Sequence, residues 1–406
     1  MMATNERTVA AAPRGFIVAV VNIIHGIIHL NMHGMSVLYP VLREQFVFGY
    51  MGIAFLSVVS QMVTGPMQIT FGVLTRLARR LHILGIGATL AFLGTIVMAV
   101  SQSYGHLVAG RVIRGIGSSP NHPVGGAIMA ASYPRDRAKA LGLHHTLGNV
   151  GGLIGPLIVG GLLHFLGWRS VVLILGFPLL LASIPCFYLK EAPAEVDPEV
   201  SAKRRGRFGL HEYRAVFRDR NALTVGLVMM VGAGGRGTGA IRTYLAVLLV
   251  DRYGISVSYA ALFFALYTFG GVIGPLALGW VADRTSPQLA VRINLLFSAV
   301  FLMLILTPAT PGIVLGAFVF LTGIFVQSRS TLLQSLLIQN GPQDVRIDTM
   351  LSSYFTLGAI SGPLWTILTG VLVDQAGMYV ALGTMSASFI AGMGLLGLIR
   401  VDRPTK

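Results

Sequence analysis

The sequence contains very little charge. Only 11% of its 406 residues are Asp, Glu, Lys or Arg, whereas 54% are hydrophobic. The mean hydropathy is correspondingly high, at +0.74. Because a soluble domain carries about 25% charged residues, this chain lacks the polar surface that would cover a soluble globule. The composition therefore excludes an ordinary soluble protein and indicates a membrane protein.

Cysteine and several catalytic motifs are also scarce or absent. Cys186 is the one cysteine in the sequence, so an intramolecular disulfide framework is excluded. The sequence has no H-E-x-x-H motif, no G-x-S-x-G motif and no G-x-x-x-x-G-K-[ST] loop. These absences argue against an intramembrane enzyme and against ATP-driven transport by this chain alone. We expect no cofactor and no resident metal.

Long apolar runs, by contrast, recur along the whole chain. Runs of about 20 apolar residues are typical of membrane-spanning helices. We therefore predict an all-α membrane protein with twelve transmembrane helices. The predicted segments are 15–42, 49–74, 82–101, 106–132, 139–165, 169–189, 222–250, 258–282, 289–308, 311–338, 349–373 and 378–400.

The formal net charge of +15 arises mostly from basic residues placed between these segments. Each loop is numbered by the segment that it follows, and residues up to three positions inside a segment end are counted with the adjoining loop or terminus. Of the 30 Lys and Arg residues, 22 then fall in the termini and even-numbered loops, three in the odd-numbered loops (Arg43, Arg169 and Arg252) and five deeper within segments. Because cytoplasmic loops carry an excess of Lys and Arg, we expect a multi-pass protein of the bacterial inner membrane with both termini in the cytoplasm. The excess charge is an orientation signal, and nucleic-acid binding is disfavoured.

A polar interval divides the predicted segments into six and six. We expect an N-terminal six-helix bundle at 1–190, a cytoplasmic linker at 191–221 and a C-terminal six-helix bundle at 222–406. Within the linker, residues 209–220 form either a short amphipathic helix on the membrane surface or part of a solvated connection.

Gly-Pro pairs occur in the middle segment of each successive group of three. The pairs are Gly65-Pro66, Gly155-Pro156, Gly274-Pro275 and Gly362-Pro363. This register predicts two halves related by pseudo-twofold symmetry, each built from two three-helix repeats, with a solute site between the halves near the midplane. Small residues let helices approach closely, and proline lets a helix bend. We therefore expect these positions to serve conformational change.

Several motifs in and after the stretch GRVIRGIGSSPNHPVGGAIMAASYP (110–134) belong together. They are His122-Pro123-Val124-Gly125, Arg111 with Gly115 and Gly117, the set Gly142, Gly151, Gly155 and Pro156, and Asp283 with Arg284 in GWVADR (279–284). With these motifs the chain resembles the major facilitator superfamily, and in particular its fosmidomycin-resistance-like branch. The resemblance implies a major facilitator fold and alternating access by rocking of the two halves. The chain departs from the family at one point, because the loop at 71–80 has no acidic residue. In the family a carboxylate in this loop helps stabilise the outward-open state, so here that contact must be weaker or made by other residues.

Five arginines lie within apolar segments: Arg111, Arg114, Arg236, Arg242 and Arg329. An Arg at the centre of a membrane helix costs about 2.5–3.5 kcal/mol even on a lenient scale, so each must reach the interface, face a wet cavity or find an acceptor. Arg111 and Arg242 lie toward segment ends, where we expect structural roles. The family resemblance implies that segments 1, 4, 7 and 10 line a central cavity. Arg114, Arg236 and Arg329 are therefore expected to bind an anion there, with helix carbonyls and water as the alternative partners.

Three histidines share one stripe of the first segment, in HGIIHLNMHG (25–34). At four-residue spacing His25, His29 and His33 lie within about 80° of one another and span about 12 Å along the helix axis. One metal ion cannot reach all three. A proton relay is the stronger hypothesis because imidazole titrates near physiological pH, and hydrogen bonding to the backbone is the open alternative for each. Asn22 falls on the same side, and His122, His144 and His145 add candidates from the fourth and fifth segments.

We therefore expect a secondary active transporter, not an enzyme, that exports a small organic anion such as a carboxylate, a phosphonate or a drug in a proton-linked cycle. Uptake or exchange of an anionic metabolite is the close alternative, and a divalent metal ion carrier that uses the histidines is the more distant one. The expected partners are the anion, protons and the lipid bilayer, and the chain is expected to be a monomer. The substrate-binding candidates are Arg114, Arg236, Arg329, His29, His33, His122 and Asn121, and the proton-coupling candidates are His25, His29, His33 and His122.

Overall fold

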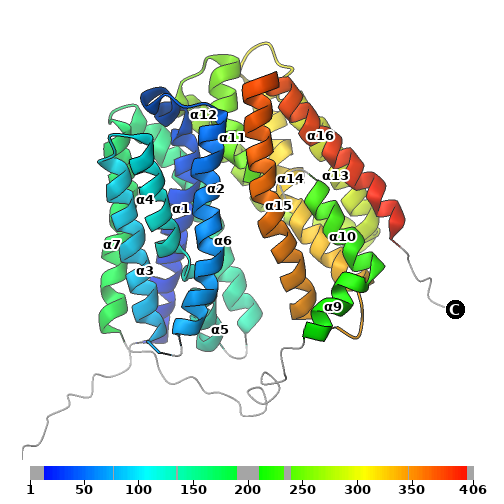
Figure 1. The fold of residues 1–406 in the computed structure, drawn as a ribbon, viewed down its shortest axis with the longest axis horizontal. Coiled ribbons are helices and arrows are strands. Elements are labelled where there is room, and N and C mark those ends of the chain that lie inside the picture. The colour runs from blue at the N-terminus through cyan, green and yellow to red at the C-terminus, as the bar shows by residue number, and fades with distance from the viewer. Residues whose placement is uncertain are drawn as a thin grey trace, which may run out of the picture. The chain divides into compact units, whose positions relative to one another are not determined.

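The structure is a computed structural model that describes residues 13–75, 77–133, 136–189, 210–232, 239–345 and 347–399. All secondary structure in these ranges is helical (Figure 1), as predicted. The first half of the sequence forms α1 (Arg14–Phe46), α2 (Tyr50–Leu74), α3 (Arg80–Ala99), α4 (Tyr104–Ser118), the π-helix η1 (Asn121–Gly125), α5 (Gly126–Ser132), α6 (Arg137–Leu163) and α7 (Trp168–Tyr188). The second half forms α9 (Leu210–Arg218), α10 (Arg220–Val231), α11 (Gly239–Tyr253), α12 (Val257–Arg284), α13 (Pro287–Leu304), α14 (Ile313–Asn340), α15 (Ile347–Ala376), α16 (Met378–Leu395) and the short helix η2 (Leu396–Leu398).

Ten of the helices in the described ranges are long and apolar enough to cross a membrane. Helix occupies all twelve predicted segments, but the fourth and the seventh are not the single helices that we expected. The fourth segment consists of α4, η1 and α5. The seventh consists of α10 and α11, and residues 233–238 between them lie outside the described residues. The structure is therefore consistent with the predicted twelve-segment pattern.

Proline accounts for the interruption of the fourth segment. Pro123 has no N–H group, so it cannot donate to the carbonyl of Ser119 as an α-helix requires. The chain winds as a π-helix over Asn121–Gly125 and returns to α-helical winding at Gly126. Single π-helical turns inside α-helices are frequent at functional sites, which draws attention to the side chains that this turn places.

The chain falls into two compact units by its internal contacts. Within the described ranges, the first unit comprises residues 13–32, 59–155 and 167–189, and the second comprises 33–58, 156–166 and 210–399. Helices α1, α2 and α6 therefore contribute residues to both units. The expected bundles at 1–190 and 222–406 remain a prediction.

Glycines set the closest helix packing in the first unit. A Cβ atom at Gly151 would lie 2.0 Å from the carbonyl oxygen of Gly26, and one at Gly155 would lie 2.1 Å from that of Leu30. These two glycines therefore seat α6 directly against α1. Small residues allow such close approach between membrane helices. Gly65, by contrast, has nothing within 4 Å of the position of its Cβ, so not every predicted Gly-Pro pair is a packing point.

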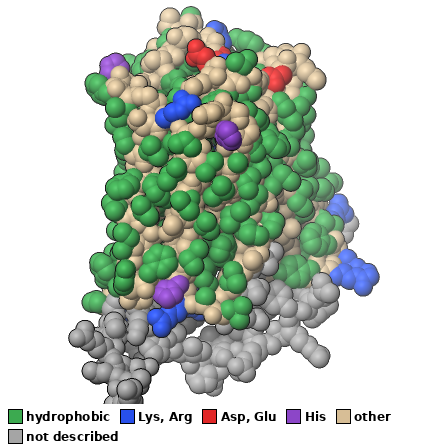
Figure 2. All heavy atoms as spheres, turned by 60° about the vertical axis from the view of Figure 1, so that its left-hand side comes forward, with side chains coloured by type: hydrophobic (Ala, Val, Ile, Leu, Met, Phe, Trp, Pro, Cys, Tyr) green, Lys and Arg blue, Asp and Glu red, His purple; other side chains and the backbone are tan. Residues whose placement is uncertain are grey.

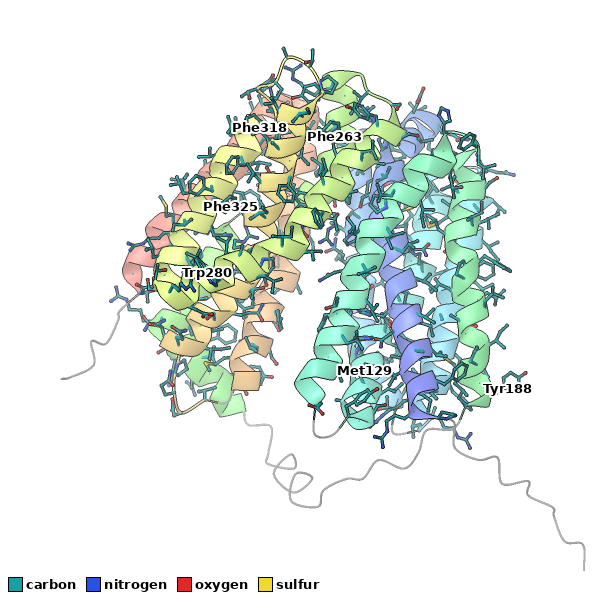
Figure 3. All side chains as sticks on the ribbon, turned by 180° about the vertical axis from the view of Figure 1, so that it is seen from behind. Met129, Tyr188, Phe263, Trp280, Phe318 and Phe325 are labelled. Atoms are coloured by element: carbon teal, nitrogen blue, oxygen red, sulfur yellow. The ribbon has the colours of Figure 1, made fainter. Side chains whose placement is uncertain are left out.

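Glycines also allow α12 and α14 to pack closely in the second unit. A Cβ atom at Gly323 would lie 2.1 Å from the carbonyl oxygen of Tyr267, and one at Gly274 would lie 2.3 Å from that of Ile324. Aromatic residues also pack between α13 and α14, where the rings of Phe301 and Phe325 stack with centroids 5.6 Å apart. Phe325 is labelled in Figure 3. The prolines of the four predicted pairs all lie inside helices, at Pro66, Pro156, Pro275 and Pro363.

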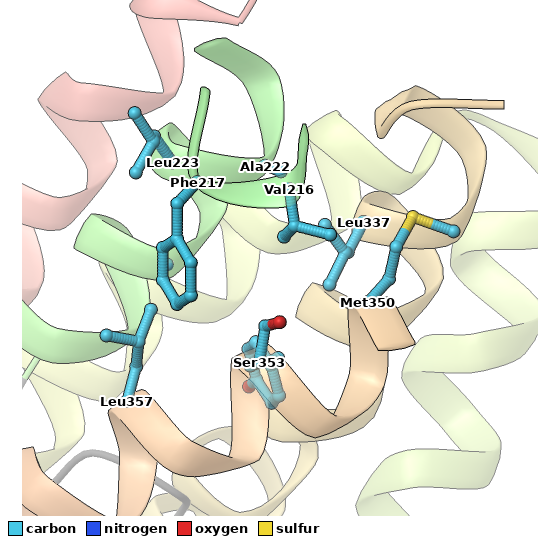
Figure 4. Close-up of a pocket in the computed structure, with 10 residues that line it drawn as sticks. Val216, Phe217, Ala222, Leu223, Leu337, Met350, Ser353 and Leu357 are labelled. Atoms are coloured by element: carbon cyan, nitrogen blue, oxygen red, sulfur yellow. The ribbon is translucent and has the colours of Figure 1, made fainter. Parts of the chain in front are cut away.

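Residues Leu210–Arg218 form the helix α9, and its position on the membrane surface stays a prediction. It packs on the second unit over a small apolar pocket between α9, α10, α14 and α15 (Figure 4). Val216 of α9 is buried beside this pocket, which Leu337, Met350 and Ser353 also line. The apolar face of α9 is thus directed into the protein.

The surface is apolar over the predicted spans. Figure 2 shows hydrophobic side chains over the middle of the visible face, while charged side chains gather toward its two ends. Large apolar residues such as Phe55, Phe177 and Leu276 are exposed. An exposed apolar surface of this extent is expected where a protein contacts lipid.

Candidate functional site

Five histidines from three elements meet inside the first unit. His25 and His29 come from α1, His122 from η1, and His144 and His145 from α6. Ring centroids lie 4.6 Å apart for His25 and His29, 5.1 Å for His25 and His122, and 3.8 Å for His25 and His144. We call these five residues the histidine cluster.

Local sequence features bring the three elements together. The four-residue spacing on α1 places His25 and His29 on one stripe, as predicted. Helix α6 can reach this stripe because it carries glycine where it faces α1. A Cβ atom at Gly148 would lie 2.5 Å from Nε2 of His25, so any larger residue there would displace the ring.

Two asparagines hold the two innermost imidazoles. Nδ2 of Asn121 lies 2.6 Å from Nδ1 of His25, and Oδ1 of Asn22 lies 2.8 Å from Nδ1 of His144. The Nε2 atoms of both His25 and His144 are buried and have no hydrogen-bond partner among the described residues. Each of these rings is thus fixed at one nitrogen and available at the other.

The histidine cluster runs from the protein interior to the surface. His25 and His144 are 0% and 1% exposed. His29 is half-buried, and His122 and His145 are exposed. Ionisable side chains that face hydrocarbon are costly, so a wet surface accounts better than lipid for the exposed edge of the cluster.

His33 is the third histidine of the stripe. It is buried in the second unit, and its ring centroid lies 6.3 Å from that of Phe264 on α12. The stripe seen in the sequence is therefore divided between two different environments.

The two arginines of α4 are buried in the first unit. Arg111 and Arg114 are 6% and 7% exposed, and α4 lies so close to α3 that a Cβ atom at Gly94 would come within 2.5 Å of the amide nitrogen of Arg114. Arg114 precedes Asn121 by seven residues, or about two helical turns. Both arginines and the cluster thus belong to the same unit.

Arg329 lies in the centre of the second unit. Its side chain is 0% exposed, and its guanidinium carbon lies 5.2 Å from the ring centroid of Phe389 on α16. A Cβ atom at Gly232, the last described residue before the gap in the seventh segment, would lie 3.6 Å from Nη1 of Arg329. Arg236 lies outside the described residues.

The motif GWVADR (279–284) forms the end of α12. The guanidinium carbon of Arg284 lies 3.7 Å from the ring centroid of Trp280, one turn earlier on the same helix. Asp283 is exposed beside it. Gly362 and Pro363 lie within α15.

The sequence did not reveal the roles of two acidic residues near helix ends, Asp251 and Asp374. Asp374 of α15 accepts hydrogen bonds from the backbone N–H groups of Tyr50 and Met51, at 2.9 and 2.8 Å, and so caps α2. Because the partners are more than 300 residues apart, no local pattern could predict this cap. The sequence did contain a sign that Asp251 pairs with Arg43. The two residues lie in odd-numbered loop regions, which the predicted topology places on the same side of the membrane.

No group of three or more His, Cys, Asp or Glu side chains within the described ranges has the arrangement of a metal site.

Comparisons with known proteins give consistent matches. A family model described as Major Facilitator Superfamily matches residues 21–366. The 4-hydroxybenzoate transporter PcaK of Pseudomonas putida is 26% identical over 343 residues, which cover 76% of this chain and 71% of that protein. The fosmidomycin resistance protein of Escherichia coli is 22% identical over 272 residues, with 66% and 65% covered. A bacterial homolog of the human lysosomal transporter Spinster, solved in an inward-facing conformation, has a similar structure, with a TM-score of 0.73 at 16% identity over 96% of both chains.

Proposed function

This chain belongs to the major facilitator superfamily, and we propose that it is a secondary active transporter that moves a small organic anion by alternating access in a proton-linked cycle. The resemblance expected from the motifs in 110–161 and 279–284 is confirmed, and so is the membership in a family of transporters rather than enzymes. The chain is a multi-pass membrane protein with an all-α major facilitator fold. The solute, the coupling ion and the direction are the subject of the proposal.

The proposal of an anionic solute rests on the sign of the buried ionisable side chains. Among the described residues, the buried side chains of acidic or basic type are Arg111, Arg114, Arg329, His25, His33 and His144, and none is Asp or Glu. Intramembrane charges of this kind mark substrate paths. An interior with basic groups alone favours a solute that brings negative charge with it.

The surroundings of Arg329 favour a planar anion. A guanidinium group binds carboxylates and phosphonates through two parallel hydrogen bonds. Phe389 lies against the guanidinium of Arg329. Trp365 of α15 belongs to the same unit, where its Nε1 donates to the carbonyl of Met230. Arg329 would therefore hold the anionic group while aromatic side chains contact the rest of the solute. An aromatic carboxylate, the kind of solute named for the Pseudomonas putida relative, suits this combination.

The histidine cluster is the proposed proton site. Histidine is the side chain that titrates near neutral pH, and the cluster supplies candidates without any buried carboxylate. We retain His25, His29 and His122 as coupling residues and His33 as a candidate in the second unit. The bias of Lys and Arg between loops supports cytoplasmic termini in an inner membrane.

Export follows from the resemblance to the fosmidomycin-resistance branch, but the electrostatics of the cluster favour a second candidate, which is uptake. A proton on a buried imidazole adds positive charge, so it would promote binding of an anion rather than compete with it. Joint binding of proton and anion is the condition for symport. Transport measured under imposed pH gradients of either sign distinguishes the two directions.

Counterflow in proteoliposomes tests the anion site. Liposomes loaded with unlabelled 4-hydroxybenzoate should accumulate the labelled compound transiently through the wild-type protein. Arg329→Gln should lower this rate about 10-fold or more, the equivalent of about 1.4 kcal/mol of lost binding. Arg329→Lys should recover only part of it, because lysine keeps the charge but not the bidentate geometry.

Arg292→Gln is the matched control, because Arg292 is an exposed residue of α13. It should exchange the solute at the wild-type rate. If Arg329→Gln and Arg236→Gln both exchange a panel of carboxylates and phosphonates as fast as the wild type does, the anion proposal is wrong.

A further inference from the structure

We propose that the stacked pair His25 and His144 holds one proton at a time, and that this proton binds to Nε2 of His144. His144 would then be the proton-binding residue, with Asn22 as its positioning residue. The inference rests on the proposed proton linkage and names the atom that carries it. The sequence suggested His144 as an additional histidine candidate, outside the four proton-coupling residues His25, His29, His33 and His122.

The hydrogen bond to Asn22 fixes the proton of neutral His144. Oδ1 of an asparagine can only accept hydrogen bonds, and it lies 2.8 Å from Nδ1 of His144. Nδ1 must therefore carry the proton, which leaves Nε2 with its lone pair. That atom is buried and has no hydrogen-bond partner among the described residues. A second proton can bind there without breaking any existing hydrogen bond.

His25 is held in the opposite way. Nδ2 of Asn121 can only donate, and it lies 2.6 Å from Nδ1 of His25. Neutral His25 must therefore accept at Nδ1 and carry its proton at Nε2. To become charged, His25 would need a proton on Nδ1, which would place two donors against each other unless the amide of Asn121 turned over. The two asparagines thus make His144, and not His25, the proton acceptor.

The stacking limits the pair to one proton. The ring centroids of His25 and His144 are 3.8 Å apart, with an angle of 28° between the ring planes. Two positive charges at this distance repel strongly in a poorly solvated interior. A neutral His25, in contrast, presents its ring face to the imidazolium of His144, which is a favourable arrangement.

The remaining histidines connect this pair to the surface. His145 of α6 and His122 of η1 are exposed, and their ring centroids lie 6.2 Å from His144 and 5.1 Å from His25. His29 of α1 is half-buried, 4.6 Å from His25. These are the titratable groups that face the pair from α1, η1 and α6 in the described ranges. Protons would enter through the exposed rings and be held at the buried one.

Nuclear magnetic resonance of nitrogen-labelled histidine tests the assignment directly. The full-length protein in lipid bilayers has ten histidines, and the signals of His144 and His25 are identified by their loss in His144→Asn and His25→Asn. At alkaline pH we expect His144 as the Nδ1–H tautomer and His25 as the Nε2–H tautomer. As the pH is lowered, His144 should gain its second proton while His25 stays neutral.

The two asparagine variants also form a matched pair for transport. An asparagine side chain places an amide group near the position of Nδ1, so His144→Asn can still donate to Asn22 but has no counterpart of Nε2. It should lose pH-driven accumulation of the solute by about 10-fold or more while counterflow at equal pH stays within about twofold, the smaller effect expected when binding is unchanged. His25→Asn keeps an acceptor for Asn121 and should lower pH-driven accumulation much less than His144→Asn does.

Asn22 provides a readout that a purely structural role would not produce. Asn22→Asp keeps the acceptor and adds a negative charge, which should move the titration of His144 to higher pH. Asn22→Leu removes the acceptor and should allow His144 to populate both tautomers.

The proposal is wrong if His25 is the ring that gains the proton, if both rings become charged together, or if His144 is an Nε2–H tautomer at alkaline pH. These signals are read without any solute. A protein that exchanges no anion would therefore contradict the proposed function while leaving the proton assignment open to this measurement.

Discussion

Arg43 of α1 and Asp251 of α11 form an ion pair with two hydrogen bonds, Nη1 to Oδ2 and Nη2 to Oδ1, each 2.6 Å long. The two residues are 208 positions apart, and both belong to the second unit. The hydroxyl of Tyr50 donates to Oδ2 of the same carboxylate at 2.5 Å, and the guanidinium carbon of Arg43 lies 5.0 Å from the Tyr50 ring centroid. The ion pair thus connects the end of α1 to the end of α11, although the two helices come from different halves of the sequence.

We expect this ion pair to make a measurable but modest contribution to the free energy of unfolding. Both side chains are 25% exposed, and exposed ion pairs contribute about 0.2–1 kcal/mol. The bidentate geometry places this pair near the upper end, at about 1 kcal/mol. A double-mutant cycle of thermal unfolding with Arg43→Ala, Asp251→Ala and the double variant would measure the coupling. Purely additive effects would show that the pair contributes nothing.

The glycines of α6 should differ sharply in their tolerance of a single methyl group. Gly151→Ala should be destabilising by about 1–3 kcal/mol or more, as overpacking usually is, because the new Cβ atom would overlap the carbonyl of Gly26. Gly142 lies on the same helix with nothing within 4 Å of its Cβ position. Gly142→Ala should therefore be neutral or slightly stabilising, since alanine favours helix by about 0.5–1 kcal/mol over glycine. Thermal unfolding in detergent compares the two, and equal effects would argue against the direct α1–α6 contact.

The single buried cysteine makes the topology directly testable. Cys186 is 0% exposed, so a maleimide should label the native protein only after denaturation. Two exposed loop positions then serve as reporters, Gln102→Cys in an odd-numbered loop and Thr285→Cys in an even-numbered one. If the termini are cytoplasmic, a membrane-impermeant maleimide should label Gln102→Cys in intact cells and Thr285→Cys only after permeabilisation. The reverse pattern would overturn the predicted orientation.

Much of the fold could be predicted because it depends on local composition. The apolar runs located all the segments, and the four-residue spacing placed His25 and His29 on one stripe. The sequence could not show that the same stripe leaves His33 against Phe264 in another unit. It also could not show that His25 stacks on His144, because that contact depends on how closely Gly148 and Gly151 let α6 approach α1.

The π-helical turn at Asn121–Gly125 was missed for a different reason. Hydrophobic periodicity detects a helix but not a change in its winding over five residues. Proline at two positions, Pro120 and Pro123, was the available sign, since neither can donate a backbone hydrogen bond. The same turn supplies Asn121 and His122, so the feature that the periodicity concealed is part of the candidate site.

This turn also divides the fourth segment into two helical phases. Each residue of an α-helix advances by about 100° around the axis, so one additional residue wound into a turn rotates everything beyond it by about that angle. A single helical wheel therefore cannot represent both Arg114 before the turn and Met129 after it. Regular winding over Asn121–Gly125 at unchanged length would swing α5 by about 100° onto a different face. Removing one residue from this turn would restore regular winding and leave α5 on its present face, because the lost residue and the lost rotation offset each other.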